Sequence, residues 1–140
     1  MKKIMLLLFG LIAVAVLIAA CGSKSSTSGT VVKSATAGNN LTVSLATTDG
    51  VLRHGQTDFT FSFTDASGKT VDVGAVAMTF HMPQMGTMPA MNNSATFTTT
   101  GTPGVYNGKV NIETAGDWQA QVSYEGPAGK GKTSFSITAQ

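Results

Sequence analysis

Phe59-Thr-Phe-Ser-Phe-Thr64 is the stretch of sequence that decides the fold. Three phenylalanines alternate with three hydroxyl residues, so an extended chain would carry an aromatic face and a polar face. Alternation with a period of two is typical of antiparallel strands that bury one face. The same pattern recurs on both sides of this stretch, in the segments 41–45, 76–80, 106–112, 118–124 and 135–137.

Short turn-forming sequences separate these segments. They are Asp49-Gly50, Ser67-Gly68, Pro103-Gly104, Ala115-Gly-Asp117 and Gly126-Pro127. No window after the first twenty residues shows convincing helical periodicity. Seven to eight short strands at this spacing predict an all-β fold, an antiparallel β-sandwich of two sheets, with a small closed barrel as the alternative.

The N-terminus predicts where the protein resides. Lys2 and Lys3 precede an apolar run that reaches Ala20, which is the charge order and length of a secretory signal. A transmembrane anchor is the alternative, but the run is shorter than the ~20 residues that span a bilayer. The small residues before Cys21 resemble the bacterial lipobox, in which the cysteine is lipidated. We therefore expect a signal peptide at 1–20, a lipidated flexible tether at 21–30 and one domain at 31–140.

Composition excludes several classes of function. Without Lys2 and Lys3, the nine basic residues fall to seven, which balance seven acidic residues. The mature chain then lacks the basic patch that nucleic-acid binding requires. Cys21 is the only cysteine, so neither a disulfide within the chain nor a thiolate metal site is expected. No nucleophile-base set is recognisable either, and we expect no catalytic residues and no enzymatic activity.

Every methionine beyond the signal peptide lies between Met78 and Met91. The segment reads Met78-Thr-Phe-His-Met-Pro-Gln-Met-Gly-Thr-Met-Pro-Ala-Met91. Dispersed methionines usually fill gaps in a core, whereas thioethers gathered beside a histidine are soft ligands that select Cu(I). No carboxylate lies between Asp72 and Glu113, which disfavours the hard cations that need charged oxygen ligands. The candidate Cu(I) ligands are His81, Met82, Met85, Met88 and Met91.

One unit occurs twice in this segment, as Met82-Pro-Gln-Met85 and Met88-Pro-Ala-Met91. If each unit forms a proline-containing turn, its methionines approach each other and chelation is favoured. If the backbone is instead a polyproline helix, neighbouring methionines lie about 9 Å apart and form an apolar docking edge.

Individual residues also have structural interpretations. Met78 is in phase with Val76 and Phe80 and is expected in the core, while Met82 could either be a ligand or close the end of the sandwich. His81 falls on the opposite face of that strand, where an exposed histidine without a role is common. His54 could join the site only if the sheet brings it there.

Several landmarks together resemble the YtkA-like domain family, which is similar to the periplasmic part of FixH proteins. They are Arg53-His-Gly-Gln-Thr-Asp-Phe-Thr-Phe-Ser-Phe-Thr-Asp-Ala-Ser-Gly-Lys69, Val73-Gly-Ala-Val76, His81-Met-Pro-Gln-Met-Gly86, Pro103-Gly-Val-Tyr106 and Ala115-Gly-Asp-Trp118. The resemblance implies an immunoglobulin-like sandwich outside the cytoplasm, often in a copper or respiratory-oxidase context. Family members often carry a histidine shortly after the Met-Gly pair, whereas Thr87 and Met88 follow Met85-Gly86 here.

These observations predict an envelope lipoprotein, lipid-anchored on the extracytoplasmic side of a membrane, whose Met-rich loop binds Cu(I) for copper tolerance or delivery. Its partners would be the membrane and an envelope protein of copper handling, efflux or oxidase assembly. The alternative is a protein-interaction module that uses the same uncharged loop as a docking surface without metal.

Overall fold

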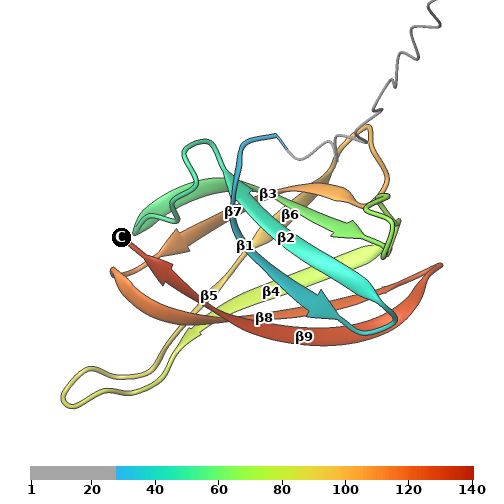
Figure 1. Ribbon diagram of the computed structural model, residues 1–140. Coiled ribbons are helices and arrows are strands. Elements are labelled where there is room, and N and C mark those ends of the chain that lie inside the picture. Colours follow the sequence, from blue (N-terminus) through green and yellow to red (C-terminus); the bar gives the residue numbers. More distant parts are fainter. Residues whose placement is uncertain (1–27) are drawn as a thin grey trace, which may run out of the picture.

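The computed structural model describes residues 28–140, which form two antiparallel sheets packed face to face (Figure 1). Within this part of the chain, no helix has the length and apolar character needed to cross a bilayer. The strands are β1 (Thr30–Ala37), β2 (Leu41–Thr47), β3 (Gly55–Thr64), β4 (Ala75–Met82), β5 (Met91–Ser94), β6 (Thr96–Thr99), β7 (Val105–Ile112), β8 (Gly116–Gly126) and β9 (Gly129–Ala139).

The strand order confirms the predicted immunoglobulin-like sandwich. One sheet runs β1-β2-β3-β7-β6 and the other β5-β4-β8-β9. Setting β1 aside, the two orders correspond to strands A-B-E-D and C′-C-F-G of an immunoglobulin domain. The described residues form nine strands rather than seven or eight, because β1, β5 and β6 were not among the segments with clear alternation.

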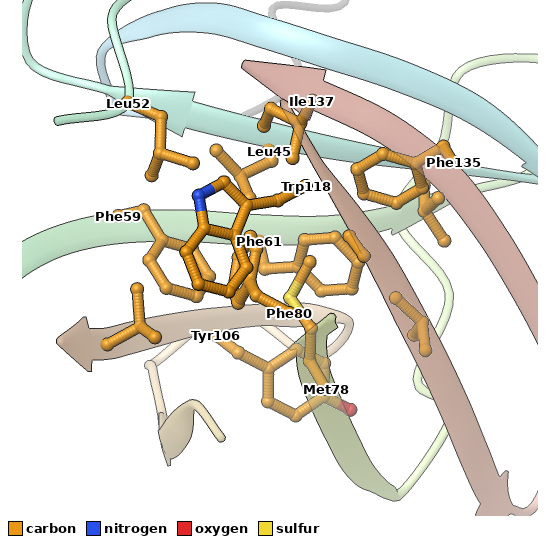
Figure 2. Packing of buried hydrophobic residues seen from close by; sticks show 14 of the residues in the cluster. Leu45, Leu52, Phe59, Phe61, Met78, Phe80, Tyr106, Trp118, Phe135 and Ile137 are labelled. Carbon is orange, nitrogen blue, oxygen red and sulfur yellow. The ribbon is translucent and has the colours of Figure 1, made fainter. Parts of the chain in front are cut away.

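The aromatic stretch in β3 forms the centre of the core, as its alternation predicted. Phe59, Phe61 and Phe63 are all buried between the sheets. The rings of Phe61 and Phe63 meet edge to face, with centroids 5.3 Å apart. Figure 2 shows Trp118 of β8 and Phe80 of β4 packed beside Phe59 and Phe61. Burial of these rings holds the two sheets together, and it fixes the position of β4, from which the candidate site extends.

The two sides of the sandwich have strand edges of different lengths, since β5 and β6 have four residues each whereas β1 and β9 have 8 and 11. On one side, the chain passes from β5 in one sheet to β6 in the other, and Ala95 at the crossing donates a hydrogen bond from its N–H to Met78 O at 2.9 Å. On the other side, β1 lies beside β9, where Thr133 Oγ1 donates to Thr36 O at 2.9 Å. The edges are therefore short on the side of the crossing, and on the other side the two long edge strands lie next to each other.

Candidate functional site: a methionine hairpin

The methionine-rich segment is a hairpin that continues β4 and β5 beyond the sheet. In the ladder between these strands, Met82 is opposite Met91, and the same register continues to an isolated bridge between Met85 and Met88. We call residues 82–91 the methionine hairpin. Figure 1 shows it as the yellow loop between β4 and β5 that projects away from the two sheets. All residues from 83 to 90 are exposed.

The turn of the hairpin lies at Gly86-Thr87. Met85 and Met88 exchange both backbone hydrogen bonds across it, with N···O distances of 3.2 and 2.9 Å. Gly86 has φ of +57°, and glycine at the first central position with positive φ is typical of a type II′ hairpin turn. A turn within each Met-Pro-x-Met unit, one of the two backbones considered from the sequence, is therefore not present. The prolines lie in the arms of the hairpin, and the turn lies between the units.

The hairpin nevertheless brings the methionines of the two units side by side, in cross-strand pairs. Partners that exchange both backbone bonds have Cα atoms about 5.5 Å apart and side chains on the same face. Met85 and Met88 form such a pair at the tip, with 53% and 44% of their surface exposed. Two long, flexible thioether side chains therefore project from adjacent positions into solvent.

The second pair, Met82 and Met91, lies at the base of the hairpin and faces the core. Met82 is only 2% exposed, and its Cε lies 3.1 Å from the position that a Cβ on Gly116 would occupy. Met91 is partly buried against the same core. Because Met82 and Met85 are three residues apart, an extended backbone directs them to opposite faces. The tip pair and the base pair are thus two separate groups of sulfur atoms.

Met78 is a core residue, as predicted, with 2% of its surface exposed. Its Sδ lies among the aromatic rings between the sheets (Figure 2), where a sulfur atom cannot reach an ion in solvent without unfolding. Met82, which the sequence left open as either a metal ligand or a core residue, is buried and packs at the end of the sandwich.

His81 lies on the outer face of β4, opposite in direction to Met82. Its Nδ1 is 2.8 Å from Oδ1 of Asn92, its cross-strand partner on β5. When the amide oxygen accepts this bond, Nδ1 carries the proton and the lone pair of Nε2 is free for another partner. Metal-binding histidines are commonly oriented in this way by a second hydrogen bond. His81 and Met85 share a face of the hairpin but are four residues apart along it.

His54 lies at the same end of the sandwich, just before β3, but it is held by a different element. The ring Nδ1 of His54 is 3.0 Å from the backbone carbonyl oxygen of Gln140, and the backbone N–H of His54 donates to the same oxygen at 2.8 Å. The imidazole of His54 therefore fixes the end of the chain beside β3.

Two residues at the base of the hairpin were missed from the sequence. Asn92 orients His81, and Asn93 Nδ2 donates to Glu113 Oε1 at 2.9 Å, which ties β5 to the β7–β8 connection. Glu113 N–H donates in return to Asn93 Oδ1 at 3.3 Å. If Gly86-Thr87 had been recognised as the hairpin turn, the hydrogen bond between His81 and Asn92 could have been predicted, because that turn places the two residues opposite each other.

The chemistry of the donors fits a soft ion better than a hard one. In the part of the chain that the structure describes, no group of three or more His, Cys, Asp or Glu side chains is placed to hold a metal. Within the hairpin, the side-chain donors are thioethers, one amide and one hydroxyl, with no carboxylate. Thioethers and imidazole suit Cu(I), whereas calcium and magnesium require several oxygen ligands.

The predicted signal peptide, Cys21 and the predicted tether as far as residue 27 lie outside the described residues. No curated protein matches the sequence, and no solved structure matches it. A family profile for YtkA-like domains matches residues 35–123, which run from β1 through most of β8 and include the whole methionine hairpin. This chain belongs to the YtkA-like family.

Proposed function

We propose that this chain is an envelope lipoprotein, anchored through Cys21, whose methionine hairpin binds Cu(I) for copper tolerance or for delivery to a membrane partner. The observation that carries the proposal is the tip pair. Met85 and Met88 are exposed, adjacent across the hairpin and fixed in register by two backbone hydrogen bonds. Soft thioether ligands at adjacent positions are suited to a soft monovalent ion.

The remaining ligands of such an ion would come from flexible neighbours of the pair. Met91, which is only partly buried, could contribute if its side chain turned from the core face toward the tip, whereas Met82 would have to leave the core. His81, oriented by Asn92, could supply Nε2 if the arms of the hairpin bend. An ion held mainly by two exposed sulfur atoms would leave open positions for the ligands of an acceptor protein, which favours transfer over storage.

The test is a Cu(I) titration of the purified protein, under anaerobic reducing conditions, against a competing Cu(I) chelator such as bicinchoninate. We expect one ion per chain, and at least about tenfold weaker binding, equivalent to about 1.4 kcal/mol, in Met85→Leu/Met88→Leu. Leucine keeps apolar bulk at both positions but provides no sulfur ligand. The matched control is Met78→Leu, which removes a buried sulfur atom and should leave the affinity unchanged. Equal affinity in the double variant would show that the tip is not the site.

A docking surface without metal is the second candidate, because Met85 and Met88 are among the few large apolar side chains that the described residues expose. Adaptable methionine surfaces are common where proteins bind variable partners. The double leucine variant separates the two functions. A docking surface would tolerate leucine, whereas a Cu(I) site would not. If the wild-type protein fails to compete with a micromolar chelator for Cu(I), docking becomes the better explanation.

A further inference from the structure

Four of the methionines in the described residues fall into two classes that differ in access to solvent by more than tenfold. Met78 and Met82 are each 2% exposed, whereas Met85 and Met88 are 53% and 44% exposed. All four lie within eleven consecutive residues. Oxidation of methionine sulfur depends on access of the oxidant, so the fold divides one short segment into protected and reactive sulfur atoms.

We propose that Met85 and Met88 are a site of oxidative modification, and that their conversion to methionine sulfoxide turns the hairpin off as a soft-metal site. The oxidant is a peroxide. It transfers one oxygen atom to each Sδ, so an S–O bond forms, the O–O bond breaks, the sulfur loses two electrons and hydrogen peroxide is reduced to water. The step requires no other reactant.

The structure explains why the fold should survive this modification. Met85 and Met88 stabilise the hairpin through backbone hydrogen bonds, while their side chains project into solvent, where a polar sulfoxide is readily hydrated. The tip is also open at Gly86, where a Cβ would meet no described residue within 4 Å other than its chain neighbours. By contrast, an oxygen atom on Met82 would be placed in the core beside Gly116.

The functional consequence rests on the proposed Cu(I) site. A sulfoxide no longer offers a soft thioether, and its oxygen is the kind of donor that hard cations prefer. Oxidation would therefore remove two ligands from the site without unfolding the sandwich. A bound soft ion should in turn occupy the sulfur lone pairs and protect them from the oxidant.

The experiment is exposure of the purified full chain to limiting hydrogen peroxide, with each methionine followed over time by tandem mass spectrometry. We expect Met85 and Met88 to oxidise at least about tenfold faster than Met78 and Met82 in the folded protein. In concentrated urea the four rates should converge, which serves as the control for intrinsic reactivity. Circular dichroism should show the folded sandwich after the tip pair is fully oxidised. Equal rates in the folded protein, or loss of the fold on tip oxidation, would overturn the proposal.

A second arm separates this inference from the proposed function. The same time course is repeated with saturating Ag(I), a soft ion that is not consumed by peroxide. Slower oxidation of Met85 and Met88, with unchanged rates at Met78, would support both proposals. Selective oxidation of the tip without protection by Ag(I) would retain the modification site and contradict the metal site.

Discussion

The sandwich and the methionine hairpin share strands β4 and β5 but are stabilised by different interactions. In the sandwich, β4 places Met78 and Phe80 between two sheets, where nearly all of their surface is buried. A few residues later the same backbone continues as the hairpin, which has cross-strand hydrogen bonds but no opposing sheet among the described residues. Sequence changes in the sandwich should therefore alter the stability of the protein, whereas changes at the exposed hairpin residues 83–90 should alter binding.

The largest effect is expected from truncation of the aromatic core. Phe61→Ala removes a fully buried ring that contacts Phe63, and it should lower the free energy of unfolding by about 3–5 kcal/mol. Urea denaturation followed by tryptophan fluorescence measures this change. A loss below about 1 kcal/mol would mean that β3 does not organise the core.

The boundary between the two regions is expected to lie between Met82 and Met85. Met82→Ala should destabilise the protein by about 2–5 kcal/mol, because it leaves a cavity beside Gly116. Met85→Ala, the matched change at an exposed methionine, should stay within about 0.5 kcal/mol of wild type. If both variants lose the same stability, the hairpin is part of the core and the comparison fails.

A smaller and local effect is expected at the turn. Gly86→Ala places a Cβ on a residue with φ of +57°, which costs roughly 1–2 kcal/mol in the hairpin conformation. Amide hydrogen exchange should accelerate about tenfold at Met85 and Met88, since their hydrogen bonds close the turn, and should not change at Phe61. Gly86→Asn is the control, because asparagine tolerates positive φ better than alanine. Faster exchange at Phe61 would indicate that the two regions open together.

The smallest effect is expected on the pH dependence of stability, through the carboxylate of Asp65. The pKa of Asp65, in the turn after β3, is lowered below its usual value of 3.8, first by the hydrogen bond from the Ser67 hydroxyl and then by the Lys69 N–H. A depressed pKa in the folded state gives stability that is present above pH 3.8 and is lost as pH falls through the folded value.

The stability difference between wild type and Asp65→Asn should therefore be constant near neutrality and shrink in acid, as measured by urea denaturation at a series of pH values. The hairpin residues 83–90 contain no ionisable side chain, so the accessibility of the tip sulfur atoms should not follow this titration. A difference that does not depend on pH would show that the charge of Asp65 contributes nothing.

The sequence was sufficient for the sandwich because its core strands alternate strictly, as in β3 and β8, and because burial follows that alternation throughout β8 and, apart from the buried Ser62, in the aromatic part of β3. It was insufficient for β5 and β6. Each of these strands has four residues and only one large apolar side chain, Met91 or Phe97, so a period of two is hardly visible in them. For the candidate site, the sequence predicted which residues belong to it but not how they are arranged. Its division into a tip pair and a base pair depends on the register of the hairpin, which is set by the position of one turn.

The crossing of the chain at Ala95 has a consequence for solubility. Strand edges with unpaired amide groups allow one molecule to add to the sheet of another, and this is a common route to aggregation. On the side of the crossing, the edge strands β5 and β6 have four residues each and belong to different sheets, so they offer little backbone to a neighbouring molecule. On the opposite side, β1 and β9 are longer edge strands that lie beside each other in different sheets, where Thr133 Oγ1 donates to Thr36 O. The side of the sandwich that carries the methionine hairpin is therefore the side with less strand edge available for such addition.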